Sequence, residues 1–280
     1  MVVKIVTDST SDISSELAKE LDITIIPVYL LFGEETFRDR VDMDEDEFYK
    51  RLTTDPVYPT TTQPTPKDFD VAYKELSKEA EGILSIHLSK KLSGTYQSAV
   101  QSAKSVKNCP IVVIDTNSVS MGLGLVVIEA AKMAKAGKGY QEIAAEVKKM
   151  IPDIHVFALF DTLKYLAKGG RIGKGKALLG SILSVRPLLT LKEGEFEPAG
   201  QVRNRRKGID RLFSYPENAK SLRELAVVHN TTPDEAKAFA ERSTSLLPRE
   251  HIRIARLGPA LGVHGGPMIL VVAFIGSRAT

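Results

Sequence analysis

The stretch Ile83-Leu84-Ser85-Ile86-His87-Leu88, followed closely by Ser93-Gly94-Thr95-Tyr96-Gln97, decides the fold of this chain. The first segment is mostly apolar, as a buried strand is, and apolar residues then recur at helical spacing from Tyr96 to Val106. The sequence therefore predicts a strand, a turn of small residues and a helix. Backbone N–H groups at a helix start lack partners and attract anions, and a glycine lets a ligand approach them. This turn is a candidate site for a small anionic head group, or else an ordinary helix cap.

The composition is that of a globular protein, because 43% of the 280 residues are hydrophobic and 26% are charged. The net charge of +3 argues against a nucleic-acid-binding surface, and only residues 203–207 are locally basic. A single cysteine, Cys109, excludes an internal disulfide and a cysteine-rich metal site. The chain enters a strand pattern at Val2 without a signal peptide, and no apolar run approaches the roughly 20 residues of a membrane span. We expect a soluble cytoplasmic protein with at most transient membrane contact.

Strands and helices alternate along the chain, which predicts an α/β fold. In the first half, strands are expected at 2–6, 23–32, 83–88 and 111–114, and helices at 13–21, 45–52, 66–81, 123–135 and 140–150, with a loop at 56–66. In the second half, strands are expected at 155–159, 187–191, 195–198, 225–229, 252–257 and 268–275, with a helix at 233–246. Gly194 is the expected turn of a hairpin between the strands at 187–191 and 195–198.

These elements predict two α/β domains, residues 1–155 and 156–280, the first with a mostly parallel sheet covered by helices. Polar turns at Asp8, Ser93 and Asp115 come directly after expected strands. Ligands of open α/β sheets bind at the carboxyl ends of the strands. The sequence therefore places a binding site at this edge of the first sheet.

Familiar cofactor motifs are incomplete in this chain. Gly122-Leu123-Gly124 begins a dinucleotide fingerprint, but Val127 stands at the third glycine position. Gly173-Lys174 resembles the end of a phosphate loop, but Lys168 stands where its first glycine belongs. The five histidines show no metal-ligand spacing. We expect no cofactor, no metal ion and no nucleotide site within this chain.

Five groups of residues, in order from end to end, resemble the DegV family of bacterial fatty-acid-binding proteins. They are Thr7-Asp8-Ser9-Thr10-Ser11-Asp12, Thr61-Thr62-Gln63-Pro64, the stretch 92–99 around Ser93-Gly94-Thr95, Leu166-Ala167-Lys168-Gly169-Gly170-Arg171-Ile172 with Arg186-Pro187-Leu188-Leu189, and Gly258-Pro259 with 262–267. The resemblance covers essentially the whole chain. One position departs from it, because the family usually runs through Gly-Pro-Gly after the histidine, whereas Gly266-Pro267 is followed here by Met268.

The resemblance implies a two-domain α/β protein that holds one long-chain fatty acid in an apolar tunnel between its domains. It also implies a non-catalytic subunit that presents the bound carboxylate to a separate ATP-dependent fatty acid kinase, which forms an acyl phosphate for phospholipid synthesis. The family pattern assigns the carboxylate to donors at Thr61, Thr62, Ser93, Gly94, Thr95 and His264. A buried carboxylate needs such donors because its desolvation otherwise costs several kcal/mol.

Two further sets of residues follow from this expectation. Candidates for the tunnel wall are Ile26, Val28, Leu30, Phe160, Leu163, Leu166, Leu179, Ile182 and Leu183. Candidates for docking of the kinase are the basic residues Arg171, Arg203, Arg205 and Lys207.

Two other functions compete with lipid carriage. The chain can be an acyl or phosphoryl transferase with Ser93 as nucleophile and His264 as its base, although no pairing aspartate can be named. It can also be a regulatory module that binds another small carboxylate or phosphate. The length of the bound ligand separates the carrier from the regulatory module, and turnover without a partner identifies a transferase.

Overall fold

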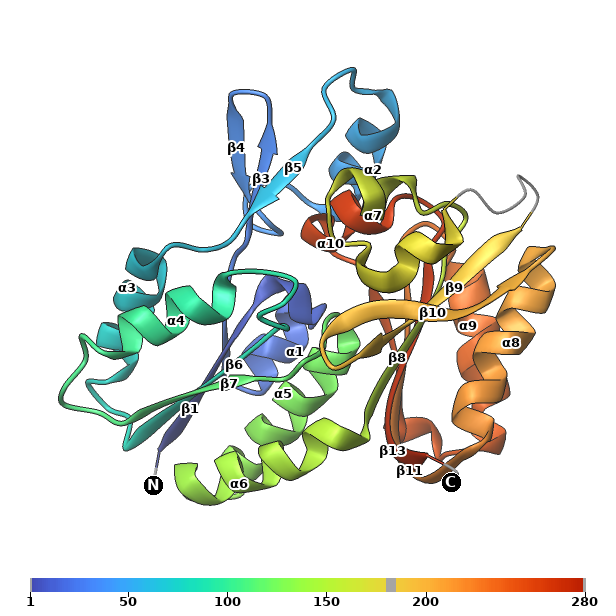
Figure 1. Ribbon diagram of the computed structural model, residues 1–280. Helices are drawn as coiled ribbons and strands as arrows, with labels where there is room; N and C mark the ends of the chain where they lie inside the picture. Colours follow the sequence, from blue (N-terminus) through green and yellow to red (C-terminus); the bar gives the residue numbers. More distant parts are fainter. Residues whose placement is uncertain (1, 180–184, 279–280) are drawn as a thin grey trace.

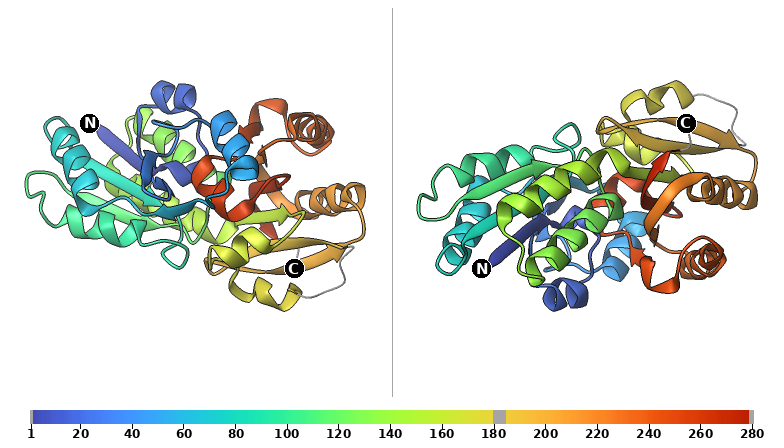
Figure 2. Two further views of the ribbon diagram at one scale, coloured as in Figure 1. Left: turned by 90° about the horizontal axis from the view of Figure 1, so that it is seen from above. Right: turned by 90° about the horizontal axis from the view of Figure 1, so that it is seen from below.

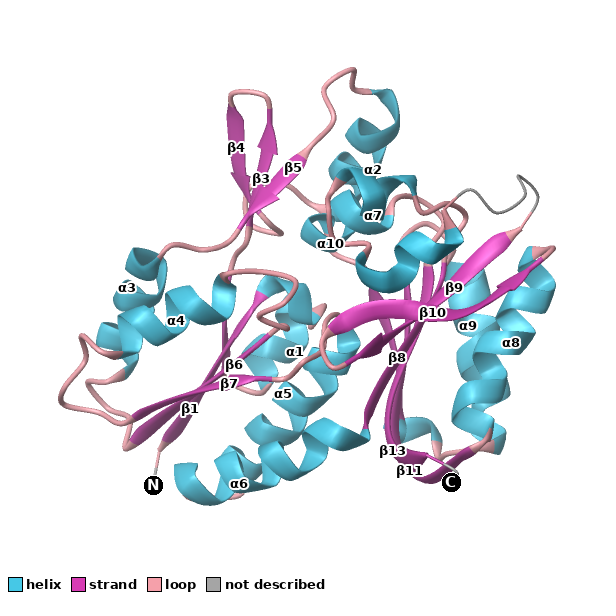
Figure 3. Ribbon diagram, viewed as in Figure 1, coloured by secondary structure: helices cyan, strands magenta, loops and turns pink. Residues whose placement is uncertain are grey.

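A computed structural model describes residues 2–179 and 185–278 of the chain. Two sheets lie side by side, and a small third sheet lies above the first (Figure 1). Helices lie on the outer faces of both large sheets and between them (Figure 3). In the described parts of the chain, no helix is both long enough and apolar enough to cross a membrane.

The first sheet is parallel, as predicted. Its strand order is β2-β1-β6-β7, with β1 (Val3–Asp8), β2 (Ile23–Ile26), β6 (Gly82–His87) and β7 (Ile111–Asp115). One face packs against α3 (Pro66–Leu76) and α4 (Thr95–Ala103), and the other against α1 (Ser15–Glu20), α5 (Met121–Lys135) and α6 (Tyr140–Met150). Because helices cover both faces, every residue of β6 is buried, which explains its apolar sequence.

The second sheet is mixed, in the order β10-β9-β8-β13-β11-β12, and only β11 and β12 run parallel. Its strands are β8 (Ile154–Leu159), β9 (Arg186–Lys192), β10 (Glu195–Val202), β11 (Ala219–His229), β12 (Ile252–Arg256) and β13 (Leu270–Arg278). The helices α8 (Arg205–Glu217) and α9 (Pro233–Arg242) cover its outer face. The hairpin predicted around Gly194 is confirmed by the antiparallel pair β9–β10.

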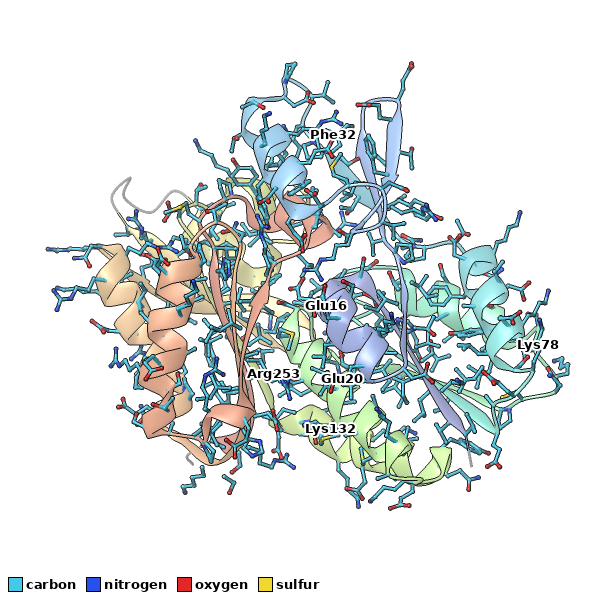
Figure 4. All side chains as sticks on the ribbon, turned by 180° about the vertical axis from the view of Figure 1, so that it is seen from behind. Glu16, Glu20, Phe32, Lys78, Lys132 and Arg253 are labelled. Atoms are coloured by element: carbon cyan, nitrogen blue, oxygen red, sulfur yellow. The ribbon has the colours of Figure 1, made fainter. Side chains whose placement is uncertain are left out.

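Alternate residues of the second sheet belong to two different cores. Phe157 and Leu159 of β8 pack into the cluster under α8 and α9, whereas Val156 and Ala158 face the first half of the chain. There they join the large core around α5, whose first eleven residues are almost all buried. Lys132, near the end of α5, lies at this junction in the view from behind (Figure 4). The domain boundary at 155/156 falls at the start of β8 and stays a prediction.

The expected long strand at 23–32 is wrong, because the chain changes sheets at Pro27. Residues after Pro27 form β3 (Tyr29–Phe32), which pairs antiparallel with β4 (Glu35–Arg38) and β5 (Thr60–Thr62). The expected loop at 56–66 therefore contains a strand. Phe32 packs edge-on against Phe48 of α2 (Glu45–Thr54), at the top of the molecule (Figure 4). Proline has no N–H to donate within a sheet, which accounts for the break.

The glycine-rich segment around His264 is helical. It forms α10 (Pro259–Gly265), which packs against α2, β3 and β5 of the first half and against α7 (Lys164–Lys168). Seen from above, α10 lies near the centre of the molecule, over the junction of the two halves (Figure 2). Short 3-10 helices complete the described chain: η1 (Ser9–Ser11), η2 (Ile151–Asp153), η3 (Gly173–Leu178), η4 (Ser243–Ser245) and η5 (Arg249–His251).

Candidate functional site

A mostly apolar cavity lies where the two halves meet, at the carboxyl edge of the first sheet. It comprises about 840 Å³ of space between protein atoms, including open solvent at its mouth. Its apolar wall consists of Val28, Leu88, Leu92, Val119, Val156, Ala158, Phe160, Leu166, Phe196, Leu257, Ala260, Leu261, Ile269 and Val271. Its polar side chains are Thr10, Thr61, Thr62, Gln63, Ser93, Ser120, Arg171 and His264. Ligand sites are commonly apolar pockets with a few placed polar groups.

Two of the predicted head-group residues form a hydrogen bond across the cavity wall. Thr61 Oγ1 lies 2.8 Å from His264 Nε2. The two residues are 203 positions apart in sequence, and they meet because β5 and α10 pack together. The pairing of Thr61 with Leu30 in β3 fixes the strand that carries this threonine.

The turn at Ser93 satisfies one N–H at the start of α4. Ser93 Oγ accepts a hydrogen bond from the backbone N–H of Thr95 at 3.3 Å and lies 2.9 Å from Thr95 Oγ1. Ser93 and Thr62 line the cavity, whereas Gly94 and Thr95 do not. Gly94 packs against Gln63, since a Cβ at position 94 would lie 2.8 Å from Gln63 Nε2. Within this turn, Ser93 is therefore the residue that meets the cavity.

His264 is mostly buried and neutral at physiological pH. Burial, and then the positive charge of Arg171, lower the pKa of His264 to about 4. Its Nδ1 atom has no hydrogen-bond partner among the described residues. A Cβ at position 169 would clash with Nδ1, so only a glycine there lets α7 cover the ring. The imidazole therefore forms its hydrogen bond through Nε2, which faces Thr61.

The four basic residues predicted to dock a partner lie in different surroundings. Arg171 lines the cavity, where its guanidinium donates to the carbonyls of Leu92 and Gly169 at 3.3 and 2.7 Å. Arg205 is only 12% exposed, and it pairs with Glu235 at 2.6 Å. Its charge is thus neutralised inside the fold rather than offered to a partner. Arg203 and Lys207 are exposed.

Three of the nine predicted tunnel residues, Val28, Phe160 and Leu166, line the cavity. Ile26, Leu30 and Leu163 are buried in cores away from its wall. Leu179 is 47% exposed and does not line it. Ile182 and Leu183 lie outside the described residues.

Ser93 has no base beside it in the described structure, and its hydroxyl contacts Thr95. His264 Nε2 is engaged with Thr61 instead. A nucleophilic serine needs a base within hydrogen-bond reach, so this arrangement does not favour the transferase. Among the described residues, no group of three or more His, Cys, Asp or Glu side chains is placed to hold a metal ion.

The family model for DegV, a family of uncharacterised proteins, matches residues 2–277. The chain belongs to the DegV family. A DegV domain-containing protein of Caldanaerobacter subterraneus subsp. tengcongensis is 35% identical over 273 residues, which cover 95% of each chain. A solved DegV family protein from Thermus thermophilus, described as fatty acid binding, has a TM-score of 0.91 and 32% identity, with 99% of this chain and 100% of that chain covered. DegV of Bacillus subtilis, described as a fatty acid binding protein, has a TM-score of 0.88 and 28% identity, with coverage of 99% and 100%.

Met268, where this DegV chain departs from the family pattern, adopts a backbone conformation that favours glycine. Met268 has a φ of 65°, in the left-handed region that glycine adopts without strain. Its carbonyl accepts a hydrogen bond of 2.6 Å from Arg205 Nη1, and Asn230 Nδ2 donates to the Gly266 carbonyl at 2.6 Å. These contacts hold the turn after α10 without the usual glycine. Arg205 is therefore part of the support of the His264 segment.

Sequence reasoning missed most of the cavity wall in this DegV chain. Val156 and Ala158 alternate with Phe157 in β8, and only the sheet geometry tells which face meets the cavity. No sequence pattern could have predicted Ser120 as a residue of the cavity wall. Its distinguishing feature is structural, because its φ of 57° and ψ of −146° are unusual for a residue other than glycine. Thr10 could have been found, since it belongs to the polar turn after β1.

Proposed function

We propose that this DegV protein binds one long-chain fatty acid, with its acyl chain in the cavity and its carboxylate at Thr61, Ser93 and His264. The observation that carries the proposal is the Thr61–His264 hydrogen bond at the edge of an otherwise apolar cavity. An elongated amphiphile with one acidic head group fits both parts of this surface. The fatty acid binding described for the Thermus thermophilus and Bacillus subtilis relatives supports the same ligand class.

The head-group chemistry follows from the neutral imidazole. With its proton on Nε2, His264 donates to Thr61 Oγ1, which leaves the threonine hydroxyl free to donate to the ligand carboxylate. Ser93 supplies a second hydroxyl, and Thr62 can supply a third from the cavity wall. Gly94 and Thr95 shape the turn that carries Ser93. The guanidinium of Arg171 adds a positive charge beside this group, which favours an anion over a neutral head group.

The acyl chain supplies most of the affinity. Each buried CH₂ contributes about 0.8 kcal/mol, so a sixteen-carbon chain gains roughly 12 kcal/mol before the cost of ordering it. Fourteen apolar side chains line the cavity and can make these contacts. A short carboxylate or inorganic phosphate would leave this surface unused, which favours the lipid over the small-anion ligand.

The bound acid is presented to a separate ATP-dependent fatty acid kinase, which converts the carboxylate to an acyl phosphate. The incomplete nucleotide motifs of this chain are consistent with a partner that brings the ATP. Arg203 and Lys207, which are exposed, are candidates for docking this kinase. Arg203→Ala is expected to spare lipid binding and slow phosphorylation, whereas unchanged phosphorylation kinetics would remove Arg203 from the docking surface.

Mass spectrometry of the purified protein, first native and then denatured, tests the proposal. One long-chain fatty acid bound in the native spectrum and released on denaturation is the expected result. Lipid that stays attached after denaturation would instead indicate a covalent acyl-enzyme at Ser93. A protein that carries no lipid and binds no added fatty acid would overturn the carrier function in favour of a different small anion.

A further inference from the structure

The helix α10 begins without a capping side chain of its own. Its N-cap residue is Gly258, and the next residue is Pro259. The first N–H groups of a helix need acceptors from outside the helix. Two carboxylates from the first half of the chain provide them: Asp12 Oδ1 accepts from Gly258 N at 2.8 Å, and Asp39 Oδ1 accepts from Ala260 N at 3.4 Å. α10 is therefore capped by residues more than 220 positions away in sequence.

Arg40 completes this capping cluster of Asp12, Asp39 and Arg40. Its Nη2 lies 3.4 Å from Asp12 Oδ1 and donates to the Arg256 carbonyl at 2.5 Å. Its Nε pairs with Glu45 Oε1 at 2.9 Å. Gly258 permits this approach, because a Cβ there would lie 3.0 Å from Arg40 Nε. Arg40 has a φ of 60°, a strained conformation that persists only where the surrounding contacts hold it.

The capped helix is also the helix that carries the head-group histidine. α10 has only seven residues, so its length is roughly 10 Å and a shift of its first turn moves His264 with it. Leu257, Ala260, Leu261 and His264 all line the cavity. The capping cluster thus lies at one end of α10, and the Thr61–His264 hydrogen bond lies at the other.

Burial disfavours the charged forms of the two carboxyls of the cluster. Burial raises the pKa of Asp39 to about 7 and that of Asp12 to about 6, although the charge of Arg40 opposes both shifts. Asp39 Oδ2 has no hydrogen-bond partner among the described residues. Ser120, another residue of the cavity wall, donates to Asp12 Oδ2 at 2.5 Å. Buried ionisable groups with shifted pKa values gather at functional sites, which supports a role in binding.

We propose that Asp12 and Asp39, with Arg40 beside them, position His264 for the head group of the ligand by capping α10 from the first half of the chain. They are positioning residues, because they act through the helix and do not line the cavity beside Thr61. This inference rests on the proposed fatty acid function, since carboxylate binding is the property that the cluster controls.

The test compares two substitutions at one position with two ligands. Asp39→Ala removes the acceptor for Ala260 N, whereas Asp39→Asn keeps an oxygen that can accept it. Binding of hexadecanoic acid and of hexadecanol is measured for both variants, and the imidazole resonances of His264 are followed by NMR. Asp39→Ala is expected to weaken binding of the acid about tenfold, as for the loss of a helix cap, and to change binding of the alcohol less than twofold. It is also expected to shift the His264 resonances, and Asp39→Asn is expected to restore both properties.

A control separates positioning from general destabilisation. Val227→Ala removes buried methyl groups from the core under α8 and α9, so it should lower stability and leave both affinities unchanged. Equal losses for acid and alcohol in Asp39→Ala, or His264 resonances that do not move, would overturn the positioning role while the fatty acid function stands. A wild-type protein that binds neither ligand would overturn the fatty acid function. The NMR comparison would then decide by itself whether the cluster positions His264.

Discussion

The backbone of Gly169 lies directly against the imidazole of His264, so closely that no side chain fits at position 169. This contact covers Nδ1 and leaves Nε2 to meet Thr61 at 2.8 Å. Gly169 closes α7 with a φ of −78°, a value that any residue can adopt. The requirement for glycine is therefore set by the histidine and not by the backbone conformation.

Gly169→Ala is expected to displace His264 and to weaken fatty acid binding at least tenfold. The new methyl group must push the ring or α7 aside, and such overpacking typically costs about 1–3 kcal/mol of stability. Isothermal calorimetry and denaturant unfolding measure the two effects. Gly139→Ala is the matched control, because that glycine also has a negative φ and no atom lies near its missing Cβ. An affinity for Gly169→Ala equal to that of Gly139→Ala would contradict the role of this contact.

Thr61→Val should weaken fatty acid binding by a factor of roughly 10–100 without unfolding the protein. The substitution removes the hydroxyl and keeps the branched shape, and a hydrogen bond to a charged group contributes about 1.5–3 kcal/mol. Titration with a long-chain fatty acid measures the loss. Thr60→Val, at an exposed position of the same strand, should bind as the wild type does. Equal affinities of the two variants would remove Thr61 from the head-group site.

The imidazole of His264 should titrate with a midpoint near pH 4, which proton NMR of the lipid-free protein can measure. Arg171→Gln should raise this midpoint, because the guanidinium opposes a second positive charge on the ring. Since the folded pKa lies below the ordinary value of 6.5, His264 contributes stability above about pH 6.5 that is lost as the pH falls toward 4. A midpoint near 6.5 would show that the ring is accessible to solvent.

Met268→Gly should be about 1 kcal/mol more stable than Met268→Ala in denaturant unfolding. Both substitutions remove the same side chain contacts, but only glycine adopts the φ of 65° without strain. At a position with ordinary backbone angles, alanine would be the more stable of the two. An alanine variant as stable as the glycine variant would mean that the turn relaxes when the methionine is removed.

Local patterns determined much of the architecture of this DegV protein. Continuous apolar runs such as 83–88 are typical of strands buried on both faces, and helical periodicity between them favours parallel pairing. The hairpin at Gly194 was equally predictable, because a turn residue there separates two strand patterns. The motifs also sufficed to identify the family, and they named four head-group residues, Thr61, Thr62, Ser93 and His264, that the structure brings to one cavity.

Only the tertiary structure decided how these pieces meet. The strand β5 and the helix α10 depend on partners far away in sequence, which no local pattern reveals. The tertiary structure also decided which charges are neutralised. Arg203 and Arg205 belong to the same basic stretch of the sequence, yet only Arg205 pairs with Glu235. The cavity wall is decided by which face of β8 turns toward α5. Sequence fixes the chemical groups and their local conformations, whereas their distances and burial arise from packing between remote segments.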